Sequence, residues 1–189
     1  MHKGRLEAFS DGVLAIIITV MVLELHEPGG GSLADLQAAV PKLLLYLLSF
    51  VFLGIYWNNH HHMFQAVQRV TGGVLWANMH LLFWLSLVPF VTNWMGEHFG
   101  PVPVAAYGAV LSAAGVAYYI LSRLLLHAHG PDSLLAKAIG NDVKGVVSVI
   151  IYLLGIGLAR FQPAVSCALY VVVALVWLVP DRRIESLLH

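Results

Sequence analysis

Six long apolar runs dominate the chain and restrict what it can fold into. They lie at residues 8–25, 41–58, 73–95, 102–126, 143–160 and 163–180. At about 1.5 Å per residue, even the shortest run makes a helix of roughly 27 Å, close to the bilayer hydrocarbon thickness of about 30 Å. Glycine or proline interrupts the sequence between the runs. The pattern predicts an all-α, integral membrane bundle of six helices, forming a single domain over residues 1–189.

The composition agrees with lipid as the solvent of the chain. Hydrophobic residues make up 59% of the 189 residues and charged residues only 11%. The ten basic residues balance the ten acidic ones and are scattered, so we expect no nucleic acid partner. The first run is followed by Glu24, His26 and Pro28 rather than by a small-residue cleavage pattern, which favours a retained helix over a signal peptide. The single cysteine, Cys167, cannot form an intrachain disulfide.

The positive charges predict the orientation. Lysine and arginine in short loops favour the cytoplasmic side. Six crossings put most of them at one end of the bundle: Lys3, Arg5, Arg69, Arg123, Lys137, Lys144, Arg182 and Arg183. Arg160 is the exception. We therefore expect both termini to be cytoplasmic. Prolines mark helix features as well, with Pro41 and Pro163 near helix starts and Pro89 at a kink in the third run.

The first run carries one continuous stripe. At 100° per residue, its members fall within about 80° of one another. They are Arg5, Phe9, Gly12, Ile16, Val20 and Leu23, with Thr19 at the edge. Ser10 and Asp11 point to other sides. Periodicity alone is satisfied by a stripe that faces lipid, with Arg5 reaching the headgroups.

Asp11 needs partners because an unpaired carboxylate near the membrane boundary is unfavourable. In the predicted orientation, Trp57 and His60 end the second helix at the matching depth, and Asn78 and His80 begin the third. We expect a hydrogen-bond network among these side chains that ties three helices together. The alternative is that Asp11 simply caps its own helix in water.

The consecutive histidines His60, His61 and His62 do not form a metal site on a helix, because neighbouring side chains diverge by 100°. Their titration near neutrality leaves pH sensing open. Neither a HExxH motif, a phosphate-binding glycine loop nor a GxSxG elbow occurs in the sequence. We expect no enzyme activity, no cofactor and no bound metal.

The motif RxxxFSD, made by Arg5, Phe9, Ser10 and Asp11 and followed by GVLAIIITVMVLEL, closely resembles the signature of the transmembrane protein 175 family of potassium channels. The chain is similar to the bacterial branch of that family, which has one six-helix repeat per chain. WNNHHHMF at residues 57–64 also resembles the family.

The resemblance implies a homotetramer in the cell membrane, with the first helix of each subunit lining a central pore and the motif bracing that helix from behind. Carried over by position, the apolar constriction falls on Ile16, Val20 and Leu23, and the pore-adjacent threonine on Thr19. Bacterial relatives often have leucine at the position of Val20. The chain has no TVGYG-like loop, so any filter must consist of side chains. The resemblance thus implies a channel with modest selectivity for K⁺ over Na⁺ and a hydrophobic gate.

Two other classes remain open from the residues. A proton- or cation-coupled secondary transporter would depend on a charge near the membrane midplane, where these runs carry almost none. A non-conducting, haem-binding helix bundle would need paired histidines deep in facing helices, and His80 is the candidate nearest a span interior.

Overall fold

The computed structural model describes residues 3–133, 135–136 and 142–178, and within them it contains helices and no strands. The helices are α1 (Lys3–Leu23), α2 (Leu33–Gln65), α3 (Gly72–Ser86), α4 (Val88–Glu97), α5 (Pro101–His129), α7 (Val143–Ala159) and α8 (Pro163–Leu178). The predicted all-α architecture is confirmed.

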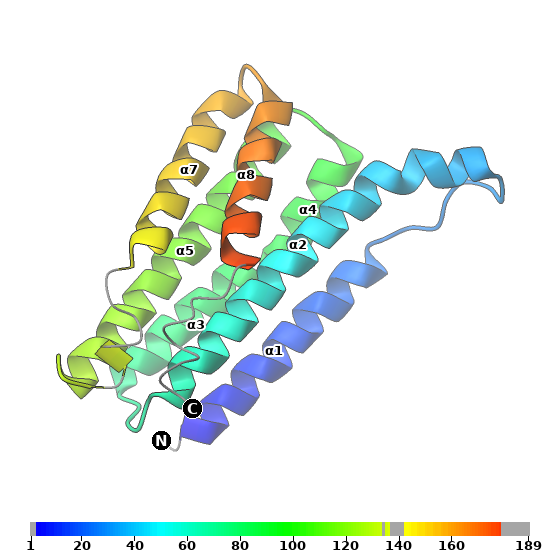
Figure 1. The fold of residues 1–189 in the computed structure, drawn as a ribbon. Helices are drawn as coiled ribbons and strands as arrows, with labels where there is room; N and C mark the ends of the chain where they lie inside the picture. The colour runs from blue at the N-terminus through cyan, green and yellow to red at the C-terminus, as the bar shows by residue number, and fades with distance from the viewer. Residues whose placement is uncertain (1–2, 134, 137–141, 179–189) are drawn as a thin grey trace.

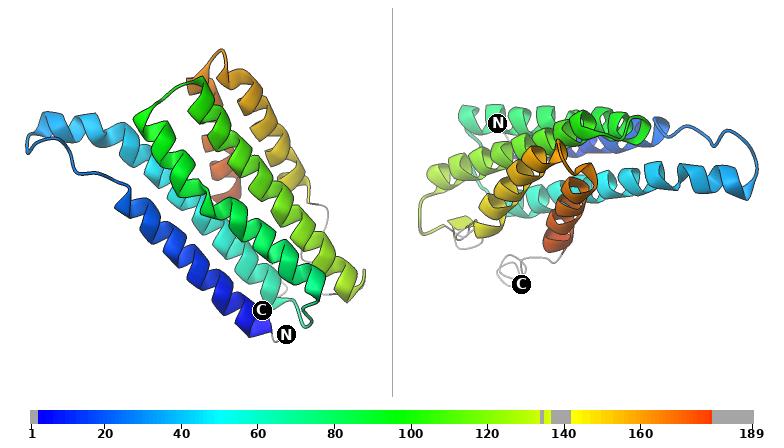
Figure 2. Two further views of the ribbon diagram at one scale, coloured as in Figure 1. Left: turned by 180° about the vertical axis from the view of Figure 1, so that it is seen from behind. Right: turned by 90° about the horizontal axis from the view of Figure 1, so that it is seen from above.

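The helices run up and down in one antiparallel bundle (Figure 1). We call the end where α1 begins the lower end, as drawn in Figure 1. Helix α1 packs against α2, α3 and α4, whereas α5 packs against α3, α4 and the α7–α8 hairpin. The first turns of α2 project away from the other helices, beyond the end of α1, which two views show (Figures 1 and 2).

By their places in the helix order, Lys3, Arg5, Arg69 and Arg123 lie toward the lower end, as predicted. Lys144 lies in the first turn of α7, which begins higher up on the same side of the bundle (Figure 1). Lys137, Arg182, Arg183 and the end of the predicted sixth run lie outside the described residues. At the upper end, Lys42 forms an ion pair of 2.6 Å with Glu97.

Four segments have the length and apolar character of a membrane crossing: α1, α2, α3 with α4, and α5. Helices α7 and α8 are apolar but shorter, with 17 and 16 residues. By length and composition, the chain can cross a membrane several times.

Helix α2 begins earlier than its apolar run suggests. Ser32 caps it, accepting from the Asp35 backbone N–H, and the Asp35 carboxylate accepts from the Ser32 backbone N–H in return. This capping box starts the helix well before Pro41, which therefore lies inside α2. The prediction that Pro41 marks a helix start is wrong, because the reciprocal cap outweighs the one backbone hydrogen bond that proline removes.

The third crossing is broken where Pro89 predicts a kink. Helix α3 ends at Ser86, and Leu87 separates it from α4, whose second residue is Pro89. Proline cannot donate to the carbonyl of Leu85, and the backbone N–H of Leu87 donates to the Trp84 carbonyl at 3.2 Å, which closes the last turn of α3. The crossing therefore consists of two short helices joined at one residue.

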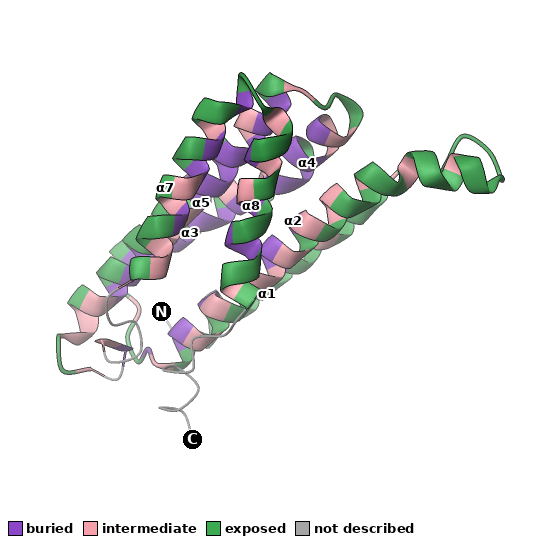
Figure 3. Cartoon of the chain, turned by 45° about the horizontal axis from the view of Figure 1, so that its top comes forward, coloured by how far each residue is buried: buried purple, intermediate pink, exposed green. Residues whose placement is uncertain are grey.

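Every described helix contributes buried residues to one core, and large aromatic side chains such as Phe52, Tyr107 and Tyr170 fill its centre. Buried colours mark this interior in Figure 3, while exposed colours follow α1 and the upper half of α2. The exposed residues of those two helices are largely apolar, including Ile16, Leu44 and Leu47. Such surface needs lipid or another chain against it.

Candidate functional site

Helix α1 has one face in the bundle and one face outside it. Its buried residues recur at helical spacing: Leu6, Ser10, Leu14, Ile17 and Met21. They pack on α2, α3 and α4. The opposite face contains the stripe that the sequence analysis singled out, and every one of its six members is exposed.

The outer face is apolar along most of its length. Ile16 is 63% exposed and Leu23 is 79% exposed, and Phe9 and Val20 are exposed with them. The Thr19 hydroxyl on this face donates to the Ile16 carbonyl at 2.8 Å. Its proton is therefore committed to its own helix, and its oxygen lone pairs remain available to accept.

Ser10 anchors the buried face of α1 to two other helices. Its hydroxyl donates to the Leu6 carbonyl at 2.9 Å and accepts from the Asn78 amide nitrogen at 2.9 Å. The Asn78 side-chain oxygen lies 2.8 Å from Nε2 of His60. An amide oxygen only accepts, so His60 donates from Nε2. The three side chains are all buried.

This chain of hydrogen bonds runs from α1 through α3 to α2. The His60 ring also stacks on Phe64, with ring centroids 4.5 Å apart. Because each buried polar group has its partner, the network fixes the rotation of α1 relative to the bundle.

Asp11 makes a second contact at the edge of the same helix. Its Oδ1 accepts from the Trp57 indole nitrogen at 3.0 Å. Trp57 in turn stacks on His61, with centroids 5.9 Å apart. The predicted hydrogen bond between Asp11 and Trp57 is present, but it joins only α1 and α2. The network that joins three helices is built on Ser10 instead, so the prediction that Asp11 ties them together is wrong.

One predicted motif partner is wrong, and two motif residues make no contact that braces α1 within the subunit. His80 does not reach the motif: its Nε2 accepts from Trp84 on the same helix at 2.9 Å. Arg5 and Phe9 lie on the exposed side of α1, and among the described residues Arg5 makes no hydrogen bond or ion pair. Ser10 and Asp11 therefore hold α1 within the subunit, whereas Arg5 and Phe9 face away from it.

Two further contacts of α1 escaped the sequence analysis. At the lower end, Lys3 donates to the Phe64 carbonyl at 3.0 Å, near the end of α2. At the upper end, Asn93 of α4 donates to Glu24 at 3.1 Å. Neither pair has a sequence signal of its own, because each joins residues more than sixty positions apart.

The neighbouring histidines take different partners, as their angular separation predicts. His60 bonds Asn78, whereas His61 lies 2.8 Å from the side-chain nitrogen of Gln65. In the part of the chain that the structure describes, no three histidine, cysteine or acidic side chains come together as metal ligands.

Comparison with known proteins identifies the family. The family model for the endosomal/lysosomal potassium channel TMEM175 matches residues 5–89. A potassium channel of Chryseobacterium sp. (strain P1-3) is 54% identical over 98% of this chain and 97% of its own length. A potassium channel of Streptomyces collinus is 31% identical over 92% of this chain and 90% of its own.

The fold has a solved relative as well. The crystal structure of a lysosomal potassium-selective channel TMEM175 homolog from Chamaesiphon minutus superposes with a TM-score of 0.80 at 30% identity. The match covers 93% of this chain and 96% of that one. The relatives of this chain are ion channels rather than enzymes, and the helices of this chain are those of a multi-pass membrane protein. The chain belongs to the TMEM175 channel family.

Proposed function

We propose that this chain is the subunit of a potassium channel whose pore is lined by the outer face of α1 from several copies. One observation carries the proposal. A buried hydrogen-bond network holds one face of α1, while the opposite face presents exposed Ile16, Val20 and Leu23 in line. A helix fixed in rotation in this way turns the same side chains outward in every copy.

A pore requires more than one chain. The described helices of one subunit pack around a filled core, so a passage forms on a symmetry axis shared by copies. We propose a homotetramer, with the lower end cytoplasmic because Lys3, Arg5 and Arg69 belong to it. Each residue of the outer face then recurs as a ring around the axis.

Apolar rings set both gating and selectivity in this proposal. Ile16, Val20 and Leu23 offer no oxygen to replace hydration water, so a permeating ion gives up part of its hydration at an energetic cost. That cost is larger for the smaller Na⁺ ion than for K⁺. Selectivity is therefore modest, with the Thr19 oxygens able to assist. When the rings come together, the constriction dewets and blocks ions.

The test replaces a ring residue by a polar one. Ile16→Asn places an amide in the constriction, which raises the leak current. It also brings the permeabilities for K⁺ and Na⁺ closer together, so the bi-ionic reversal potential moves toward zero. The measurement is bi-ionic recording and liposome flux with K⁺, Na⁺ and Cs⁺. The matched control is Ile150→Asn, the same change at an exposed isoleucine of α7.

An Ile16→Asn channel that behaves like the Ile150→Asn control would remove α1 from the pore. Saturable flux coupled to a second ion, without single-channel current, would instead identify a secondary transporter.

A further inference from the structure

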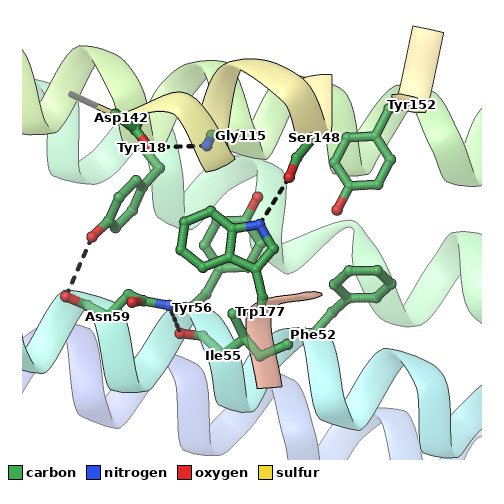
Figure 4. Close-up of a pocket in the computed structure, with 11 residues that line it drawn as sticks. Phe52, Ile55, Tyr56, Asn59, Gly115, Tyr118, Asp142, Ser148, Tyr152 and Trp177 are labelled. Carbon is green, nitrogen blue, oxygen red and sulfur yellow. Dashed lines mark hydrogen bonds between the residues drawn. The ribbon is translucent and has the colours of Figure 1, made fainter. Parts of the chain in front are cut away.

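A cavity separate from α1 lies among α2, α5, α7 and α8. It encloses about 40 Å³ and opens to one side of the bundle. A single water needs about 10–15 Å³, so the cavity has room for a group of a few heavy atoms. Figure 4 shows its walls, which are Phe52, Ile55, Tyr56, Asn59, Gly115, Tyr118, Asp142, Gly145, Ser148, Tyr152 and Trp177.

Aromatic rings from all four helices form the walls. Tyr56 and Tyr118 meet edge to face with centroids 6.1 Å apart, and Phe52 and Tyr152 do so at 6.3 Å. Trp177 is held between these pairs, as its indole nitrogen donates to the Ser148 hydroxyl at 2.8 Å (Figure 4). The rings are thus fixed in place around the space.

Oxygen atoms that can accept hydrogen bonds also line the cavity. The Tyr118 hydroxyl donates to the Asn59 backbone carbonyl at 3.3 Å, and the Asn59 amide nitrogen donates to the Ile55 carbonyl at 2.8 Å. Among the described residues, the hydroxyls of Tyr56 and Tyr152 make no hydrogen bond, and neither does the side-chain oxygen of Asn59. These three oxygens are available to a ligand.

The one charged group of the wall is negative. Asp142 caps α7, with Oδ1 accepting from the Gly145 backbone N–H at 2.9 Å. Within the described residues, no lysine or arginine forms an ion pair with it. Among the residues that the structure describes, its charge therefore has no cation paired with it, and it lies beside a largely aromatic space.

We propose that this cavity binds a small organic ammonium group. Aromatic faces attract cations through their ring quadrupoles, a carboxylate supplies the opposite charge, and phenolic oxygens accept N–H hydrogen bonds. Two glycines keep the space open. A Cβ on Gly115 would lie 3.3 Å from Val149 and 3.7 Å from the Tyr56 hydroxyl, and a Cβ on Gly145 would collide with the Asp142 carboxylate. The ammonium group comes from a free amine or from the amine headgroup of a lipid.

The experiment titrates the full chain in nanodiscs of phosphatidylglycerol, a lipid without an amine. Propylammonium is the probe, 1-propanol is its neutral counterpart of similar size, and ligand-detected NMR measures the dissociation constant. We expect saturable binding of propylammonium that is at least about tenfold tighter than binding of 1-propanol, corresponding to the gain from one charge-assisted contact.

Two variants locate the binding in this cavity. Asp142→Asn removes the charge but keeps a side chain that caps helices as well as aspartate does, and it weakens propylammonium about tenfold. Gly115→Ala adds a methyl group to the wall and weakens binding as well. The controls are Asp132→Asn, in the exposed loop after α5, and Gly157→Ala, whose Cβ meets nothing within 4 Å.

Nanodiscs that contain phosphatidylethanolamine distinguish the two sources. If the lipid headgroup occupies the cavity, propylammonium binds more weakly in the nanodiscs that contain phosphatidylethanolamine. If the cavity takes a free amine instead, the affinity for propylammonium is the same in both kinds of nanodisc. Propylammonium binding that Asp142→Asn leaves intact would place the amine elsewhere and overturn the proposal. Equal binding of 1-propanol, or no saturable binding, would overturn it too.

Discussion

Two buried polar clusters hold this bundle together, and they differ in chemistry. At the lower half, Ser10, Asn78 and His60 join α1 to α3 and α2. Higher up, the Ser49 hydroxyl lies 2.7 Å from that of Thr92 and 2.9 Å from that of Tyr107, joining α2, α4 and α5. The second cluster does not include α1.

The chemical difference between the two clusters determines how firmly each one fixes the orientation of its helices. A hydroxyl can rotate to suit its neighbours, so the Ser49 cluster tolerates small shifts of its helices. The Asn78 amide has a donor end and an acceptor end, and each faces a single buried partner. The lower cluster therefore specifies one rotation of α1, whereas the upper cluster mainly satisfies polar groups in the core.

The largest expected effect comes from breaking the lower cluster at its centre. Asn78→Leu keeps the side-chain size but leaves the buried Ser10 and His60 without their partner, which costs about 2–4 kcal/mol. The measurement is the free energy of unfolding in detergent. Met79→Leu, at the exposed neighbouring position, is the control. Equal stability of the two variants would mean that the amide does not hold α1.

A smaller effect is expected in the upper cluster. Tyr107→Phe removes one hydroxyl, but Ser49 keeps Thr92 as a partner, so unfolding becomes easier by only about 1 kcal/mol. Tyr119→Phe on the outer side of the same helix controls for loss of a phenol. A loss as large as that of Asn78→Leu would show that the two clusters contribute equally to the free energy of unfolding.

The smallest effect on subunit stability is expected at the exposed motif residues. Arg5→Ala and Asp11→Asn leave unfolding of the subunit nearly unchanged, because among the described residues Arg5 makes no hydrogen bond or ion pair and asparagine keeps an oxygen that accepts from Trp57. Both changes lower the yield of tetramer, because both side chains are exposed on α1, where other copies would meet it. Light scattering after size exclusion measures the yield. Arg123→Ala, an arginine stacked on Tyr119 of α5, is the control. A wild-type yield of tetramer from both variants would show that Arg5 and the Asp11 charge are not needed for assembly.

Much of this fold could be predicted from the chain itself. The apolar runs located every described helix, and Pro89 located the break in the third crossing. The start of α2 was missed because a capping box of only Ser32 and Asp35 outweighs the apolar boundary and Pro41.

The site was predictable on α1 and less so on α3. Helical angles separated the two faces of α1 without any tertiary information. On α3, Asn78 and His80 lie 200° apart, so only one of them can face Ser10, and the choice depends on how α3 is rotated. The sequence has no signal for that rotation, because α3 is apolar on every side. Met79 and Phe83, on the side away from Asn78, are as apolar as the buried Val74, Leu81 and Leu82.

The single-residue break at Leu87 gives α1 two independent supports. Ser10 joins the lower half of α1 to α3. Glu24, the residue directly after the last residue of α1, joins its upper end to α4. A change in the angle between α3 and α4 would thus move the two attachment points of α1 relative to each other. If both attachments stay intact, α1 would bend between them, in the segment that contains Ile16 and Val20.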